Sequence, residues 1–295
     1  MNPIVEIKSL SKRYFNELVL DGVTLEVMPQ RFYALLGHNG AGKSTLLKIL
    51  AGQEFADEVE GVILGEKFHH DFGELKNHIG FVSEGINFEV NTSLEKFFKY
   101  YRRSFSDWDQ EFFEDLMYKR GFDLTREFIQ FSRGQKMQIV LIATLATRPK
   151  IMMVDEVTSV LDVYARKYYI NLLLDYVKKG GTVIMTTNII TEVQNIANAA
   201  IMIDHKKILF NKTIEELKND ILKLRRTRDN HTNPIFDSPY CYWIGTNSDL
   251  SDSYVIDKNY IEQFAIPSDL YDRRAITLEE IYMYYASRSD FGGGG

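Results

Sequence analysis

The chain has 295 residues with a composition typical of a soluble globular protein, and its net charge of −6 argues against a general nucleic-acid binder, because phosphate backbones require a basic surface. Its single cysteine, Cys241, excludes a disulfide within the chain and fits a reducing compartment. No signal-peptide pattern is visible, and the apolar runs at 139–146 and 151–154 are too short to span a bilayer, so we expect any membrane-spanning part of the system to be a separate chain.

The first half of the chain alternates short apolar runs with turn residues and then changes to helical spacing. Strands are predicted at residues 4–7, 19–27 with a turn at Asp21-Gly22, 32–36, 62–64 and 79–82. A helix is predicted to begin near residues 46–51. From 93 to 118 aromatic and apolar residues recur at helical spacing, and we interpret these aromatic stripes as core.

The second half predicts further alternation of helices and strands. Helices are expected at 135–146 and 163–177, and buried strands at 151–154, 182–187 and 200–204. Fully apolar strands that alternate with helices indicate an α/β fold with a mixed, mostly parallel sheet covered on both faces. A capping-box sequence at 277–280 predicts a terminal helix.

A glycine-rich loop lies between the predicted strand at 32–36 and the predicted helix at 46–51. It fits the pattern G-x-x-x-x-G-K-[ST] with Gly37, His38, Asn39, Gly40, Ala41, Gly42, Lys43, Ser44 and Thr45. The glycines let consecutive N–H groups converge on an anion, and the helix N-terminus and Lys43 add positive charge. The Ser44 hydroxyl suits Mg²⁺ held between two phosphates. The loop therefore predicts a P-loop that binds a nucleoside triphosphate.

The ordered set of motifs in residues 4–210 resembles the ATP-binding subunits of ABC transporters. In this comparison the P-loop corresponds to Walker A, and Asp155-Glu156 after the strand at 151–154 corresponds to Walker B with the catalytic glutamate. Tyr14 matches the aromatic residue that stacks on adenine. The signature L-S-G-G-Q and the D-loop correspond to Phe131, Ser132, Arg133, Gly134 and Gln135, and to Ser159, Val160, Leu161 and Asp162.

The resemblance implies a role for each matched residue. Asp155 would hold Mg²⁺ directly or through water, because Mg²⁺ prefers hard oxygen ligands. Glu156 would orient and deprotonate the water that attacks the γ-phosphate. In the family, Ser132 and Gly134 contact the ATP of the opposite subunit, so that two such domains enclose two nucleotides.

Four residues depart from the family pattern around the nucleotide. Glu84 stands where the family has a glutamine that contacts Mg²⁺ and the attacking water, and a carboxylate can still ligate Mg²⁺. Asn188 replaces the switch histidine, and its amide can donate to a phosphate oxygen without being titratable. Arg133 occupies a signature position that is normally glycine. Val157 replaces a proline, a change that we expect to be minor.

We hypothesise that Arg133 of one subunit compensates the charge of Glu84 in the other, because a guanidinium can offset a carboxylate and hold a phosphate. On this hypothesis Arg133→Gly lowers ATPase activity more than Glu84→Gln does, and the double change restores activity. Drift in a copy with a weakened site is the alternative explanation.

The predicted organisation is an ABC-type ATP-binding domain at 1–210, a C-terminal accessory module at 211–291 and a flexible glycine tail at 292–295. Within the first domain we expect an antiparallel β subdomain and a helical signature subdomain at about 85–148. The fold class is that of a P-loop NTPase.

The resemblance implies the ATPase subunit of a bacterial exporter, which works on the cytoplasmic face of the membrane. Its expected cofactors are ATP and Mg²⁺. Its expected partners are a separate membrane-spanning permease subunit and a second ATP-binding subunit, identical or not, and no nucleic acid. One alternative is a slow ATP-binding switch that gates a membrane partner, favoured by Glu84, Arg133 and Asn188. Another is a soluble ABC protein of DNA repair or translation, which the length and motif number disfavour.

Overall fold

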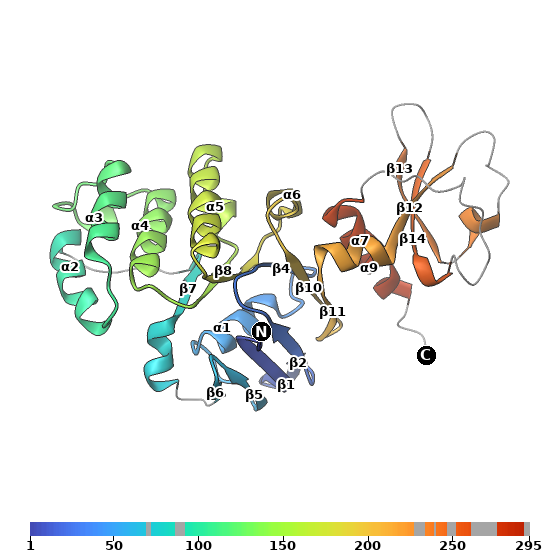
Figure 1. The fold of residues 1–295 in the computed structure, drawn as a ribbon, viewed down its shortest axis with the longest axis horizontal. Coiled ribbons are helices and arrows are strands. Elements are labelled where there is room, and N and C mark those ends of the chain that lie inside the picture. Colours follow the sequence, from blue (N-terminus) through green and yellow to red (C-terminus); the bar gives the residue numbers. More distant parts are fainter. Residues whose placement is uncertain are drawn as a thin grey trace.

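The computed structural model describes residues 1–68, 72–85, 92–226, 234–238, 240–246, 252–260 and 276–291. A six-stranded sheet with the order β11-β10-β4-β9-β8-β7 lies at the centre (Figure 1). Neighbouring strands from β10 to β7 run parallel, and β11 pairs antiparallel with β10 at one edge. These strands are β4 (Phe32–Leu36), β7 (Ile79–Ser83), β8 (Ile151–Asp155), β9 (Thr182–Thr186), β10 (Ala199–Asp204) and β11 (Lys207–Thr213). The predicted mostly parallel sheet is confirmed.

Every residue of β4, β8, β9 and β10 is buried, because both faces of this sheet are covered. Side chains alternate between the two faces along each strand. Phe32 and Ala34 belong to the hydrophobic cluster on one side, whereas Tyr33 and Leu35 belong to a second cluster on the other. The continuous apolar run that predicted β4 therefore contributes to two cores at once.

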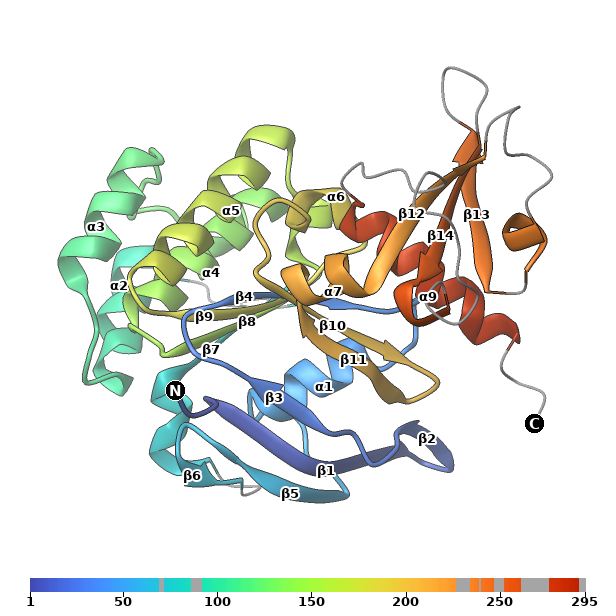
Figure 2. The same cartoon turned by 45° about the vertical axis from the view of Figure 1, so that its right-hand side comes forward.

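A second, five-stranded antiparallel sheet covers the lower side of the molecule (Figure 2). Its strands are β1 (Val5–Tyr14), β2 (Glu17–Leu20), β3 (Leu25–Val27), β5 (Glu58–Ile63) and β6 (Glu66–Lys67). Helix α1 (Lys43–Leu50) lies between the two sheets, and Leu46, Leu47, Ile49 and Leu50 are buried in the second cluster. This packing fixes the N-terminus of α1 at the carboxyl end of β4.

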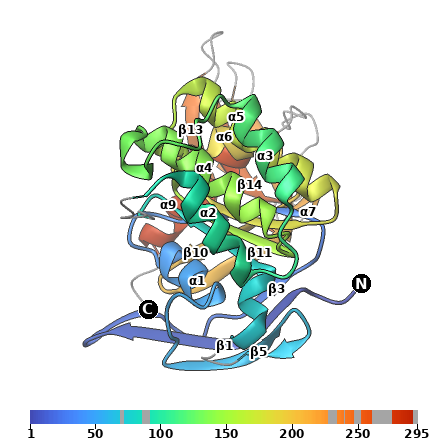
Figure 3. The ribbon, with the colours of Figure 1, turned by 90° about the vertical axis from the view of Figure 1, so that its left-hand side faces the viewer.

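The opposite side of the six-stranded sheet carries a helical region, which faces the viewer in Figure 3. It contains α2 (Leu94–Tyr101), α3 (Gln110–Lys119), α4 (Arg133–Ala146) and α5 (Val163–Lys178), with the short helices η2 (Arg102–Ser104), η3 (Phe128–Gln130) and η4 (Val157–Val160). A further short helix, η1 (Gly73–His78), instead packs Leu75 against the second cluster. The rings of Phe98 and Phe113 lie 4.7 Å apart and both are buried, and Trp108 packs on each of them. The interpretation of the aromatic stripes as core is confirmed.

The C-terminal part adds a three-stranded antiparallel sheet of order β12-β14-β13. Its elements are α7 (Ile214–Asp220), β12 (Ile221–Arg226), η5 (Pro234–Asp237), β13 (Cys241–Thr246), β14 (Asp252–Asp257) and α9 (Leu278–Phe291), preceded by the short α6 (Ile190–Val193). This part of the chain has a small hydrophobic cluster of its own, which includes Phe236 and Tyr254. However, Val255, Ile281 and Tyr284 belong to the large cluster of the central sheet, so one core continues from the six-stranded sheet into this part of the chain.

Two sequence expectations concern this region. The capping box at the start of α9 is confirmed, because Glu280 N–H donates to Thr277 Oγ1 (3.1 Å) and Thr277 N–H donates to Glu280 Oε2 (2.8 Å). The glycine tail at 292–295 lies outside the described residues. No helix in the described part of the chain is both long and apolar enough to cross a membrane.

Candidate functional site

The glycine-rich loop joins the end of β4 to the start of α1 and brings a ring of backbone groups to one place. Gly37 has a φ of 151°, and a Cβ there would lie 2.5 Å from the Ile203 carbonyl oxygen. Gly42 has a φ of 99° and stands directly before the helix. Only glycine fits both positions without strain. The loop therefore leaves the α1 N-terminus open towards an anion, as the sequence predicted.

Lys43 is held inside this loop by backbone carbonyls. Its Nζ donates to Gly37 O (2.8 Å) and His38 O (2.9 Å), and the side chain is buried. Burial lowers the pKa of Lys43, and the negative charges of Glu156 and Asp155 partly oppose that shift. The ammonium group thus lies between the loop and two acids, where a triphosphate would supply stronger acceptors than the carbonyls.

The hydroxyl and carboxylate expected to hold Mg²⁺ are in direct contact. Ser44 Oγ donates to Asp155 Oδ1 at 3.0 Å, and Thr186 Oγ1 donates to the same oxygen at 2.8 Å. No group of three or more His, Cys, Asp or Glu side chains suited to a metal occurs among the described residues. This donor set fits Mg²⁺, which takes hard oxygen ligands from one or two protein groups and the rest from phosphates and water. It does not fit a metal that needs a complete protein cage.

Glu156 follows Asp155 at the end of β8 in an uncommon backbone conformation. Its φ is 51°, its N–H donates to Thr186 Oγ1 (3.0 Å), and its carbonyl accepts from Ser159 Oγ (2.9 Å). A non-glycine residue in the left-handed region is strained and persists only where its surroundings hold it. These contacts turn the Glu156 side chain towards the cavity beside the P-loop.

That cavity has a volume of about 390 Å³ and is lined by eight of the predicted site residues. It is lined by Tyr14, Val19, Asn39, Gly40, Gly42, Lys43, Ser44, Thr45 and Glu156. Tyr14 is 38% exposed and lines the cavity, so its ring is available for stacking. The Tyr14 hydroxyl donates to Glu54 Oε2 (3.2 Å), and Lys12 Nζ lies 4.9 Å from the ring centroid and 3.0 Å from Glu54 Oε1. Lys12 and Glu54, which the sequence did not single out, hold this ring in place.

The signature residues lie at the N-terminus of α4, and none of them lines this cavity of their own chain. Ser132, Arg133 and Gln135 are exposed. Ser132 N–H donates to Gln135 Oε1 (2.9 Å) and Gln135 N–H donates to Ser132 Oγ (3.3 Å), which completes a capping box. Asp162 similarly caps α5 by accepting from Ala165 N–H at 2.8 Å. Part of these motifs therefore has a local structural function.

Glu84 and Arg133 form an ion pair within one chain. Glu84 follows β7, and its N–H lies 3.4 Å from the carbonyl oxygen of Asp155, so the pair is adjacent to the Mg²⁺ ligands. The sequence hypothesis placed Arg133 opposite the Glu84 of another subunit. The structure instead pairs them in the same chain, where Arg133 is the first residue of α4 and Glu84 directly follows β7.

Asn188 follows β9 and lines a second cavity on the other side of the P-loop. Asn39 is common to both cavities. The loop before α6 is tied down by Glu192, which accepts from Thr187 Oγ1 (3.4 Å) and pairs with Arg166 of α5 (2.9 Å). Asn188 therefore lies beside the P-loop, and the loop that contains it is also connected to the helical region.

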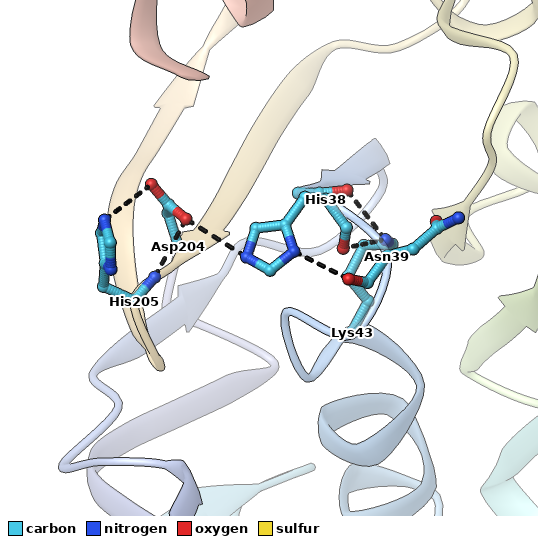
Figure 4. Close-up of polar contacts among 6 residues, drawn as sticks. His38, Asn39, Lys43, Asp204 and His205 are labelled. Carbon is cyan, nitrogen blue, oxygen red and sulfur yellow. Dashed lines mark hydrogen bonds and ion pairs between the residues drawn. The ribbon is translucent and has the colours of Figure 1, made fainter. Parts of the chain in front are cut away.

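His38 connects the P-loop to the end of β10 (Figure 4). Its Nδ1 lies 2.7 Å from the Asn39 carbonyl oxygen, which can only accept, so Nδ1 carries a proton. Its Nε2 lies 3.5 Å from Oδ1 of Asp204, a carboxylate whose side chain is only 5% exposed. His205 Nε2 lies 3.8 Å from the other oxygen of that carboxylate. The sequence did not predict this contact.

The fold and the site together define a P-loop nucleoside triphosphatase. The sequence profile of the ABC transporter family matches residues 20–159. The energy-coupling factor transporter ATP-binding protein EcfA1 of Ligilactobacillus salivarius is 32% identical over 239 residues, which cover 74% of this chain and 82% of that protein. The chain belongs to the ABC transporter family of ATP-binding proteins. It therefore binds ATP with Mg²⁺ and is an ATP hydrolase coupled to transport.

Two further comparisons agree. The methionine import ATP-binding protein MetN of Campylobacter jejuni is 28% identical over 243 residues, which cover 72% of each chain. The solved structure of an ATP-binding subunit of an ABC transporter superposes with a TM-score of 0.65 at 20% identity, over 73% of this chain and 92% of that one. The structural likeness shows the fold, and the sequence relatives show the family.

Proposed function

We propose that this protein is the ATPase subunit of an exporter and drives a separate membrane-spanning subunit from the cytoplasmic face of the membrane. The observation that carries the proposal is that Tyr14, Lys43, Ser44 and Glu156 line one cavity, with Asp155 bonded to Ser44 beside it. A triphosphate cradle, a pair of Mg²⁺ ligands, a carboxylate base and an aromatic platform are the parts that ATP hydrolysis requires.

In the proposed mechanism, Tyr14 stacks on the adenine ring and the P-loop N–H groups and Lys43 bind the phosphates. Ser44 and Asp155 would hold Mg²⁺, which neutralises charge on the phosphates when it is bound. The Glu156 carboxylate orients a water molecule and accepts its proton as that water attacks the γ-phosphate. The Asn188 amide donates to a γ-phosphate oxygen, and its N–H groups can do so at any pH because an amide does not titrate.

We further propose that two ATP-binding subunits close around two nucleotides. Exposure of Ser132 and Arg133, away from the cavity of their own chain, supports this arrangement, since Ser132 faces solvent and Arg133 can contact the nucleotide of a partner once its pair with Glu84 is broken. Closure and reopening would move the membrane subunit, and conformational steps of this kind commonly set the turnover rate.

Export is the proposed direction, and it rests on the resemblance of the sequence to exporter ATPases. Among the relatives, MetN is named as an import protein, so import is the competing direction. The direction is a property of the whole transporter. Uptake and efflux assays with the membrane subunit present would therefore decide it, and uptake alone would refute the proposal.

A second candidate function is an ATP-binding switch with slow turnover. The Glu84–Arg133 pair favours it, because an acid that would face Mg²⁺ is engaged by a cation of the same chain. A paired Glu84 is less available to the metal, and a paired Arg133 is less available to a partner nucleotide. Binding without rapid hydrolysis is the expected consequence.

Steady-state hydrolysis of Mg-ATP separates the two functions. The sample is the full chain purified with the membrane subunit that it binds, and Glu156→Gln is the matched control, since it keeps the size of the side chain and removes the base. Turnover on the order of 1 s⁻¹ or faster that Glu156→Gln abolishes supports the motor. Turnover equal to that of the Glu156→Gln variant, with ATP still bound, refutes it and supports the switch.

A further inference from the structure

A cavity of about 300 Å³ adjoins the P-loop, and one of the residues that line it comes from the C-terminal helix. Its wall is formed by Leu36, Gly37, His38, Asn39, Thr187, Asn188, Ile190 and Tyr282. Seven of these eight residues belong to the P-loop region or to the loop that contains Asn188. Tyr282 alone comes from the C-terminal module, 94 residues further along the chain than Asn188. The phosphate end of the nucleotide site and the C-terminal module therefore share one cavity.

The packing of α9 fixes the position of Tyr282. Ile281 and Tyr284, its neighbours on α9, are fully buried and belong to the same cluster as Val193 of α6, which begins two residues after Asn188. The Tyr285 ring packs on Phe210 with 4.9 Å between centroids. In both Figures 1 and 2 the α9 ribbon begins close to α6. Because α9 is anchored by residues on both sides of Tyr282, the Tyr282 ring is held against the loop that contains Asn188.

An ion pair connects the start of α9 to the rest of the C-terminal module. Lys223 of β12 and Glu280 of α9 lie 2.6 Å apart, and their side chains are only 15% and 21% exposed. A partly buried pair of this kind is less screened by solvent than a surface pair. A displacement of the small β sheet would therefore be transmitted to α9 and to Tyr282.

The electrostatic surroundings keep the Tyr282 hydroxyl protonated. Burial raises the pKa of Tyr282, and the negative charge of Asp204 raises it further. Asp204 is the same carboxylate that faces His38 of the P-loop (Figure 4). A neutral phenol can donate one hydrogen bond and accept another. Asn188 lines the same cavity, and its exposed side chain makes no hydrogen bond within the described part of the chain, so its amide is available to such a partner.

We propose that Tyr282 is a positioning residue that orients the Asn188 amide across this cavity and so makes ATP turnover depend on the C-terminal module. This inference rests on the proposed function, in which Asn188 donates to the γ-phosphate. Tyr282 does not touch the nucleotide cavity itself. Its loss should therefore lower the rate of the chemical step and leave ATP binding almost unchanged.

The test compares Tyr282→Phe, which removes only the hydroxyl, with Tyr285→Phe, which removes a hydroxyl from the same helix at a position packed on Phe210. Both are measured for kcat and KM of Mg-ATP hydrolysis in the full chain with its membrane subunit. We expect Tyr282→Phe to lower kcat about tenfold with KM within about twofold, as for one lost positioning hydrogen bond, and Tyr285→Phe to match the unmodified protein.

A cycle with Asn188→Ala makes the result specific to positioning. If Tyr282 acts through Asn188, adding Tyr282→Phe to Asn188→Ala causes no further loss of kcat. Additive losses, or an unchanged kcat in Tyr282→Phe, overturn the inference and leave the proposed function intact. Turnover of the unmodified protein equal to that of Glu156→Gln overturns the proposed function and this inference with it. The two failures are therefore distinguishable.

Discussion

The pairing of Glu84 with Arg133 inside one chain predicts that removal of Glu84 favours closure of two ATP-binding subunits. In the open chain the pair must be broken before Arg133 can face a partner nucleotide. The side chains are 31% and 64% exposed, so the pair is partly solvated and belongs with surface salt bridges, which contribute about 0.2–1 kcal/mol. Two pairs in a dimer amount to about 0.4–2 kcal/mol, or roughly a 2- to 30-fold change in the dimerisation constant.

The assay is ATP-dependent dimerisation of the full chain by analytical ultracentrifugation. Glu156→Gln serves as the background, because it slows hydrolysis and keeps ATP bound. Glu84→Gln should tighten dimerisation at low salt, and the gain should shrink at about 1 M salt, where the screening length falls to about 3 Å. Glu60→Gln is the matched control, since it breaks an exposed pair with Lys8 on the antiparallel sheet.

The sign of the effect decides between the two arrangements. If Arg133 compensates Glu84 of the other subunit, as the sequence hypothesis has it, Glu84→Gln removes an attraction that exists only in the dimer and weakens dimerisation. If the pair within one chain opposes closure, Glu84→Gln strengthens dimerisation. Equal dimerisation constants for Glu84→Gln and the background, or an equal gain in Glu60→Gln, would refute the reasoning developed from the structure.

Three further predictions test other contacts. Thr186→Val removes the donor to Asp155 and the acceptor of Glu156 N–H, so we expect kcat to fall about tenfold or more and stability to fall by about 1–3 kcal/mol, measured by hydrolysis and urea unfolding. Tyr14→Ala should raise the KM for ATP by about 5- to 160-fold, as loss of about 1–3 kcal/mol of stacking requires, with kcat retained. Burial raises the pKa of Cys241 to about 12, so its thiol should resist iodoacetamide at pH 8 until the protein unfolds. Because the unfolded thiol loses its proton first, stability should also fall as pH rises from about 9 towards 12.

The parts of the site that the sequence predicted are those encoded by neighbouring residues. The P-loop requires a strand, glycines, a lysine and a helix in succession, and each of these has a local signature. Asp155 and Glu156 were found because two acids after four apolar residues at the end of a strand need a cation partner. Short-range chemistry of this kind does not depend on how distant segments are arranged.

The contacts that the sequence missed depend on pairing between distant segments. Thr186 reaches Asp155 because β8 and β9 run parallel with these two residues in register, which a threonine in a buried apolar strand does not reveal. Glu84 and Arg133 are 49 positions apart, and both had been assigned to a nucleotide between subunits. Tyr282 was one of three tyrosines in the predicted terminal helix, and its place beside Asn188 follows only from the shared core.

The charges of Glu84 and Arg133, which both depart from the family pattern, constrain the identity of the second subunit. Within one chain, Glu84 adds a negative charge beside the Mg²⁺ ligands and Arg133 adds a positive one, so the open site is balanced. When Arg133 turns to a partner nucleotide, its own site loses that cation. On the sequence hypothesis, in which Arg133 compensates the Glu84 of the other subunit, a dimer of two identical chains would give each site the Arg133 of the other chain and so keep the balance. With a partner that has glycine at this signature position, the site containing Glu84 would keep an uncompensated carboxylate near the γ-phosphate. That asymmetry would slow hydrolysis at one site only, so comparing the turnover of a homodimer with that of a dimer carrying Arg133→Gly in one subunit distinguishes the two assemblies.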